Sequence, residues 1–237
     1  LPTKLVYIVE ETGTNGLDVT YEGETGTITK NVPQQATVTN TRKKGGLEVT
    51  KTLHSDLPSD KDLSFTFQIK LTPALSGTFD GVEFNEQGIA TFTLKGGQSK
   101  TITGLPDGIG FEVTETNANG LVNTWTDDIK SGKIAKNTTK SVEAVNTRPT
   151  GGLLVKKTLH SSLPSDADLV FTFEIKLSEK INKSFSGVQF DKDGVATIQL
   201  KGGQSKTISG LPAGVGFTVT ETNAQGLVNT WTDEIQG

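Results

Sequence analysis

The sequence predicts an all-β protein built from tandem Ig-like β-sandwich domains, and three observations support this fold class. Gly and Thr are abundant and turn dipeptides are frequent, whereas signals for the starts and ends of helices are few. Apolar and polar residues alternate in many short runs, as strands with one buried face require. One long stretch of the chain also occurs twice, which indicates an array of similar domains.

The repeat defines the expected domains. Residues 45–131 align without gaps to 151–237, and 58 of the 87 paired residues are identical. The opening segment resembles the end of the same repeat, because Val38 to Arg42 resembles Ala144 to Arg148. The expected units are the C-terminal part of one repeat (1–43), one complete repeat (44–149) and the N-terminal part of a further repeat (150–237). We expect a mature or excised window of a longer array whose units sit end to end.

Alternation and turn residues place the strands of the complete repeat. Strands are predicted near residues 47–54, 64–71, 81–84, 89–95, 98–103, 110–117, 121–126 and 140–146. Gly96-Gly97 and Leu105 to Gly108 supply turns between them. Seven or eight short strands in about 100 residues indicate a two-sheet sandwich.

Composition argues against several classes of function. Charge is mixed, with 23 Lys and Arg against 27 Asp and Glu, so we expect no nucleic-acid partner. No apolar run approaches 18 residues, so we expect no membrane insertion of this segment. Cysteine is absent, which rules out disulfides as the means of stabilisation. Phe190 to Gly194 hints at a calcium loop, but its counterpart Phe84 to Gly88 lacks the paired aspartates, and we expect no metal.

A lysine shares the apolar face of the first predicted strand. Leu47, Val49 and Leu53 fall on one face, and Lys51 falls on the same face. A buried lysine is costly because desolvation penalises its charge. Alone, such a residue is more often at a strand edge with its amine in water.

Two other polar residues occupy inward positions in the same way. The first is Glu115, which shares one face of its strand with Phe111 and Val113. The second is Asn146, which shares a face with Val142 and Ala144 at the end of the strand near 140–146. The matching positions in the other copies are Lys157 and Glu221 in the last and Glu11 and Asn40 in the first. Alternation selects Lys157 as the inward residue and predicts that Lys156 faces outward.

These residue types permit one specific reaction. Desolvation lowers the pKa of a buried lysine, and its neutral amine is then a nucleophile. A neighbouring carboxyl group can polarise the asparagine carbonyl and carry protons. The amine attacks the side-chain carbonyl carbon, ammonia leaves, and an amide joins the two side chains, with proximity in a rigid core supplying most of the acceleration. No cofactor is needed.

The order of motifs resembles the B-type Cna repeats, the isopeptide-forming domains of Gram-positive surface adhesins and pilins. The motifs are Val-Thr-Lys-Thr at 49–52, Leu-Pro-x-Gly-x-x-Phe-x-Val-Thr-Glu-Thr at 105–116 and Val-Asn-Thr at 145–147. The resemblance implies that Lys51 is the nucleophile, Asn146 the acceptor and Glu115 the catalytic acid. It implies matching roles for Lys157, Glu221, Glu11 and Asn40.

We therefore expect a structural stalk segment of a cell-surface adhesin or pilus-like protein, extracellular and anchored to the cell wall. It would turn over no external substrate, because the reactive groups face the core. The alternative is a ligand-binding adhesin module that recognises a host protein or glycan. The expected partners are neighbouring repeats, and molecules could also associate head to tail, with Lys157 of one meeting Asn40 of the next.

Overall fold

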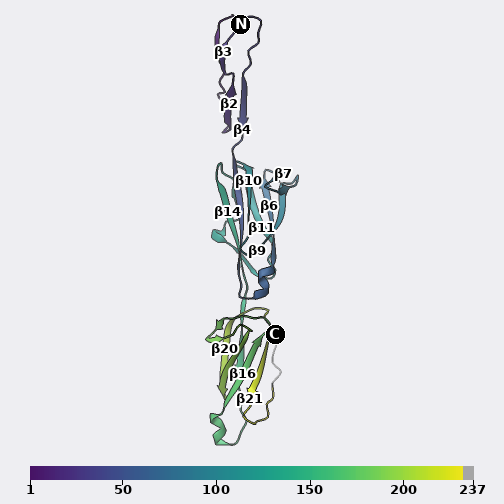
Figure 1. Ribbon diagram of the computed structural model, residues 1–237, viewed down its shortest axis with the longest axis vertical. Helices are drawn as coiled ribbons and strands as arrows, with labels where there is room; N and C mark the ends of the chain where they lie inside the picture. The colour runs from purple at the N-terminus through teal and green to yellow at the C-terminus, as the bar shows by residue number, and fades with distance from the viewer. Residues whose placement is uncertain (232–237) are drawn as a thin grey trace.

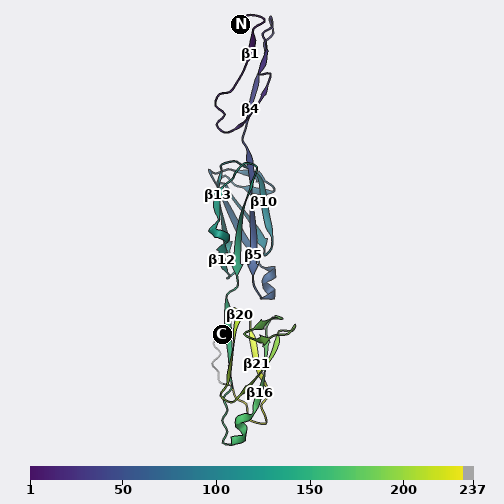
Figure 2. The same cartoon turned by 90° about the vertical axis from the view of Figure 1, so that its left-hand side faces the viewer.

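The computed structural model describes residues 1–231 as three β units that follow one another along a rod (Figures 1 and 2). We call them the first unit (1–43), the middle repeat (44–149) and the last unit (150–237). Apart from three short 3₁₀ turns, every regular element within residues 1–231 is a strand, so the predicted all-β class is confirmed. No helix in this part of the chain has the length and apolarity to span a bilayer.

The first unit consists of two small antiparallel pairs. Its strands are β1 (Val6–Ile8), β2 (Asp18–Glu22), β3 (Thr25–Thr27) and β4 (Thr37–Thr41). β1 pairs with β3, and β2 pairs with β4. None of its described side chains is fully buried, so this unit has little core of its own.

The middle repeat is a sandwich of two four-stranded sheets (Figure 1). One sheet has the order β10-β5-β14-β12, formed by β10 (Ser99–Pro106), β5 (Lys44–His54), β14 (Thr139–Thr147) and β12 (Val122–Trp125). The other has the order β13-β11-β6-β9, formed by β13 (Ser131–Lys133), β11 (Gly110–Asn117), β6 (Ser64–Thr72) and β9 (Ile89–Lys95). A hairpin of β7 (Gly77–Phe79) and β8 (Val82–Phe84) and the 3₁₀ turns η1 (Pro58–Asp62) and η2 (Thr126–Asp128) complete the repeat.

Alternating side chains of the two sheets fill the space between them. Val49 of β5, Phe67 and Ile69 of β6 and Val113 of β11 are fully buried there. Removing each large apolar side chain from water contributes about 1.5–3 kcal/mol. This dry layer is the environment into which the inward polar residues must fit.

The first and last strands of the middle repeat, β5 and β14, lie side by side and run parallel. Their register sets Ala144 opposite Lys51 and Asn146 opposite Leu53. All other strand pairs of this repeat are antiparallel. The parallel pair therefore brings Lys51 of β5 close to Asn146 of β14, although the two residues lie far apart in the sequence.

The last unit repeats the front part of this arrangement. β15 (Thr150–Lys156) pairs with β20 (Ser205–Pro212), and β16 (Val170–Leu177) lies between β19 (Val195–Lys201) and β21 (Phe217–Asn223). A hairpin of β17 (Ser184–Phe185) and β18 (Val188–Gln189) and the turn η3 (Pro164–Asp168) match β7, β8 and η1. Lys156 is exposed, as the alternation predicted.

Candidate functional site

A lysine, a glutamate and an asparagine meet inside the middle repeat. Lys51 comes from β5 and Asn146 from the adjacent β14, while Glu115 comes from β11 of the facing sheet. Lys51 and Asn146 are both 0% exposed, and so is the side chain of Glu115. Each strand delivers its polar residue inward because the preceding residues of the same parity are buried apolar ones.

The glutamate contacts both other residues. Lys51 Nζ lies 3.2 Å from Glu115 Oε2 and also donates a hydrogen bond to the carbonyl oxygen of Ala144 at 3.4 Å. Asn146 Nδ2 donates a short hydrogen bond to Glu115 Oε1. One carboxyl group thus bridges the amine and the carboxamide, and a proton carrier for a reaction between them would occupy this position.

The surroundings of Lys51 favour its neutral form. Burial lowers the pKa of the Lys51 amine, and the charge and hydrogen bond of Glu115 oppose this effect only in part. The amine also lies 4.3 Å from the centre of the Phe65 ring. A lowered pKa gives a larger fraction of amine with a free lone pair, which is the nucleophilic form.

Sequence reasoning missed a fourth member of the site, Asn123 of β12. Asn123 Nδ2 donates to Asn146 Oδ1 at 2.7 Å and to Glu115 Oε2 at 3.2 Å. The two asparagines are direct cross-strand partners. Alternation could have identified Asn123, because it lies between buried Leu121 and half-buried Trp125 on the same face of the strand.

Asn123 is placed to stabilise negative charge on the Asn146 carbonyl oxygen. We predict that Asn123→Val slows any amide formation between Lys51 and Asn146 by roughly 10²-fold, because one donor to a developing oxyanion is typically worth that much. The first unit has valine at the matching position, Val19 opposite Asn40, so this residue suits the strand. Time-resolved intact mass of freshly synthesised protein, followed from the end of its translation, would measure the rate.

The matched control for this variant is Asn229→Val in the last unit. It makes the same chemical change at the equivalent position of the other copy. The role assigned to Asn123 would be wrong if both variants matured at the rate of the parent chain.

Each of the other units holds counterparts of two of these three site residues. In the last unit, Lys157 Nζ lies 2.8 Å and 3.1 Å from the two carboxylate oxygens of Glu221 and 4.0 Å from the centre of the Phe171 ring. In the first unit, Asn40 Nδ2 donates to Glu11 Oε1 at 3.0 Å, and Glu11 Oε2 is buried with no hydrogen-bond partner among residues 1–231. Within one chain the middle repeat lies between the unit of Asn40 and the unit of Lys157 (Figure 1). The contact expected between Lys157 of one molecule and Asn40 of the next stays a prediction.

Relatives of known type share parts of this chain. The pilus tip adhesin Cpa of Streptococcus pyogenes is 36% identical over 107 residues, which is 42% of this chain and 16% of that protein. The chain therefore spans about a sixth of the length of this curated relative.

Among solved structures, a pilus-presented adhesin Cpa is 28% identical, with a TM-score of 0.38 over 44% of this chain and 27% of the other. The major pilin of Streptococcus pyogenes is 16% identical, with a TM-score of 0.43 over 78% and 83% of the two chains. A Mobiluncus mulieris adhesin described as containing disulfide, isopeptide and ester cross-links is 20% identical, with a TM-score of 0.34 over 49% and 44%.

The fold and the match to the pilus tip adhesin identify the units of this chain as Cna B-like domains of the pilin and adhesin type. The resemblance inferred from the sequence motifs is thereby confirmed. The chain belongs to the family described as a domain of unknown function, DUF7601, whose model matches residues 45–148 and again 151–237.

Proposed function

We propose that the chain is a stalk segment of a surface adhesin or pilus, and that its middle repeat locks itself with an amide between Lys51 and Asn146. The observation that carries the proposal is the placement of Glu115, which contacts both side chains in a fully buried site. The stalk would project from the cell wall and would act on no external substrate.

The contacts suggest how the bond forms. A proton passes from Lys51 Nζ to Glu115, which frees the lone pair of the amine. The amine attacks Cγ of Asn146, and the negative charge that develops on Oδ1 is stabilised by Asn123. The bond between Cγ and Nδ2 then breaks, Nδ2 takes a proton from Glu115, and ammonia leaves. The former amine returns one proton to the carboxylate and keeps the other as the amide N–H.

The location of the bond supports a mechanical role. It would join the first strand of the repeat to the last and close a loop of about 96 residues, which by analogy with a disulfide stabilises by roughly 4–5 kcal/mol. Load entering through β5 could then leave through β14 without separating the strands between them. Such a covalent lock suits a stalk segment that contains no cysteine.

The mass of the intact, denatured protein tests the proposal. We expect the parent chain to be lighter than its sequence by one ammonia, and peptide mapping to find Lys51 joined to Asn146. Glu115→Ala should have the full mass, because the proton carrier is lost. The matched control Glu221→Ala should still lose one ammonia. A folded parent chain at full mass would contradict the proposed bond.

The second candidate function is recognition of a host protein or glycan, and the similarity to a pilus tip adhesin favours it. The matched region is a small part of that relative. One hollow lies where the middle repeat meets the last unit and is lined by residues of both, among them His54, Arg148 and Lys183. Screening the folded chain on glycan and matrix-protein arrays separates the candidates, since a stalk should give no specific signal.

A further inference from the structure

A short loop of the middle repeat is packed into the last unit. This joint loop, residues 55–63, follows β5 and contains the turn η1. Leu57 at its start is 7% exposed and belongs to the hydrophobic core of the last unit rather than to that of its own repeat. The loop lies where the two units meet (Figure 1). An apolar residue of one unit thus completes the core of the next.

A buried ion pair fixes the joint loop to the chain that crosses into the last unit. Arg148 Nε donates to Asp60 Oδ2 at 2.7 Å, and Nη2 donates to Oδ1. Asp60 is 3% exposed, and burial opposes its charge. The hydrogen bonds from Arg148 and Ser55 outweigh this effect and lower the pKa of Asp60. Arg148 Nη1 also donates to the carbonyl oxygen of Ala213 in the last unit at 3.2 Å.

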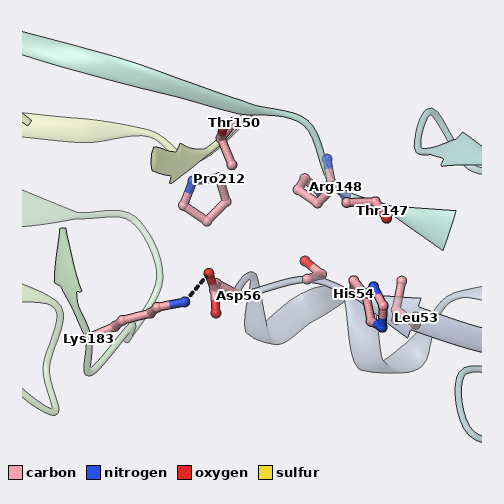
Figure 3. Close-up of a pocket in the computed structure, with 9 residues that line it drawn as sticks. Leu53, His54, Asp56, Thr147, Arg148, Thr150, Lys183 and Pro212 are labelled. Atoms are coloured by element: carbon pink, nitrogen blue, oxygen red, sulfur yellow. Dashed lines mark hydrogen bonds and ion pairs between the residues drawn. The ribbon is translucent and has the colours of Figure 1, made fainter. Parts of the chain in front are cut away.

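Polar contacts surround the buried part of the joint. The backbone N–H and the hydroxyl of Ser59 donate to the two oxygens of Glu179 at 2.9 Å and 2.6 Å. Lys183 Nζ lies 2.7 Å from Asp56 Oδ2, and this ion pair crosses the hollow between the units (Figure 3). Both contacts connect the joint loop to the segment of the last unit between β16 and β17.

The equivalent loop of the last unit, which no further unit covers within residues 1–231, is a natural comparison. It shows that Leu57 and Asp60 are buried by contact with the last unit and not by the fold of the loop itself. Leu163 occupies the position of Leu57 but is 63% exposed. The side chain of Asp166, the counterpart of Asp60, accepts a hydrogen bond from Ser161 alone within residues 1–231. The loop has the same 3₁₀ turn in both copies.

The receiving surfaces of the two copies also differ. Pro73 and Gly77 in the middle repeat stand where the last unit has Glu179 and Lys183. The middle repeat therefore lacks both side chains that bind the joint loop. Leu75 of the middle repeat is only half-buried, whereas its counterpart Ile181 is buried.

We propose that the joint loop is a docking surface for the head of the repeat that follows it, and that the middle repeat and the last unit move as one rigid body. The partner that fits the loop is a repeat head with an apolar pocket, a carboxylate at the position of Glu179 and an amine at the position of Lys183. Units joined by a short linker otherwise move relative to one another by default. The proposal does not depend on the amide bond.

Distances between spin labels on the two units test this proposal. Because the chain has no cysteine, Thr91→Cys in β9 and Thr197→Cys in β19 give one exposed label in each unit. The parent chain should show one narrow distance distribution. Leu57→Asp places a charge in the core of the last unit, and we expect a distribution about twofold broader or more, as for freely jointed domains.

Leu163→Asp is the matched control, since it makes the same change at the exposed counterpart, and its distribution should stay narrow. Arg148→Ala should broaden the distribution by a different route, because it removes the bonds to Asp60 and Ala213 and leaves the buried Asp60 carboxylate without its cation. Circular dichroism verifies folding, and intact mass reports the amide separately. A broad distribution in the parent chain, or a narrow one in both Leu57→Asp and Arg148→Ala, would overturn the proposal.

Discussion

Loss of the amide is expected to lower the free energy of unfolding of the middle repeat by about 4–5 kcal/mol, the loop-closure contribution of a cross-link across such a long loop. The double variant Lys51→Met with Glu115→Gln isolates this effect. It prevents the reaction and leaves neither charge in the core, where Lys51 and Glu115 are fully buried. Glu115→Ala alone should lose more, because it strands Lys51 without its partner, and an unpaired buried charge costs about 3–5 kcal/mol further.

Guanidinium unfolding followed by tryptophan fluorescence measures this loss. Trp125 reports the middle repeat, because its ring packs against Phe67 at 6.5 Å between ring centres. A Trp231→Phe background removes the tryptophan of the last unit. Glu221→Ala should leave the Trp125 transition unchanged. An unaltered midpoint in the double variant would show that the bond does not form or does not stabilise.

The amide should also prevent most of the middle repeat from extending when the chain is pulled from its two ends. Load would pass down β5 to Lys51, cross the bond to Asn146 and leave through the end of β14, so the residues between would never extend. Single-molecule pulling of the parent chain should therefore show no long unfolding step from this repeat. Glu115→Ala should add one step of about 300 Å, since some 94 released residues extend by up to about 3.3–3.6 Å each.

The last unit gives the internal reference for this experiment. Its unfolding step should have the same length in the parent chain and in Glu115→Ala, because the substitution lies in another unit. If the two chains released the same total length, load would not be passing through a covalent bond at Lys51.

Much of the middle repeat could be predicted from alternation alone. Each of the eight predicted strands has a counterpart, because each contributes alternate side chains to one core and a one-residue slip would turn them to solvent. β13 was not predicted, since Ser131 to Lys133 is exposed throughout and pairs with β11 only through its backbone. β7 was not predicted either, because it lies where the sequences of the two copies diverge.

The inward direction of Lys51, Glu115 and Asn146 followed from the same rule, and the structure brings these side chains into one site. Their roles in bond formation remain predictions. Asn123 was overlooked because a single polar residue in a short strand is usually exposed to solvent. The burial of Leu57 in the last unit could not be predicted from the neighbouring sequence. An apolar residue next to Pro58 in a turn is buried only when another unit covers it.

The parallel pairing of β5 and β14 has a geometric consequence for any longer array. Because the first and last strands run in the same direction, the chain enters the repeat at one end and leaves it at the opposite end. Every added copy would then advance the tip by one full domain length, and reach would grow in proportion to copy number. An antiparallel pair would return the chain to the pole where it entered and fold successive copies back on one another.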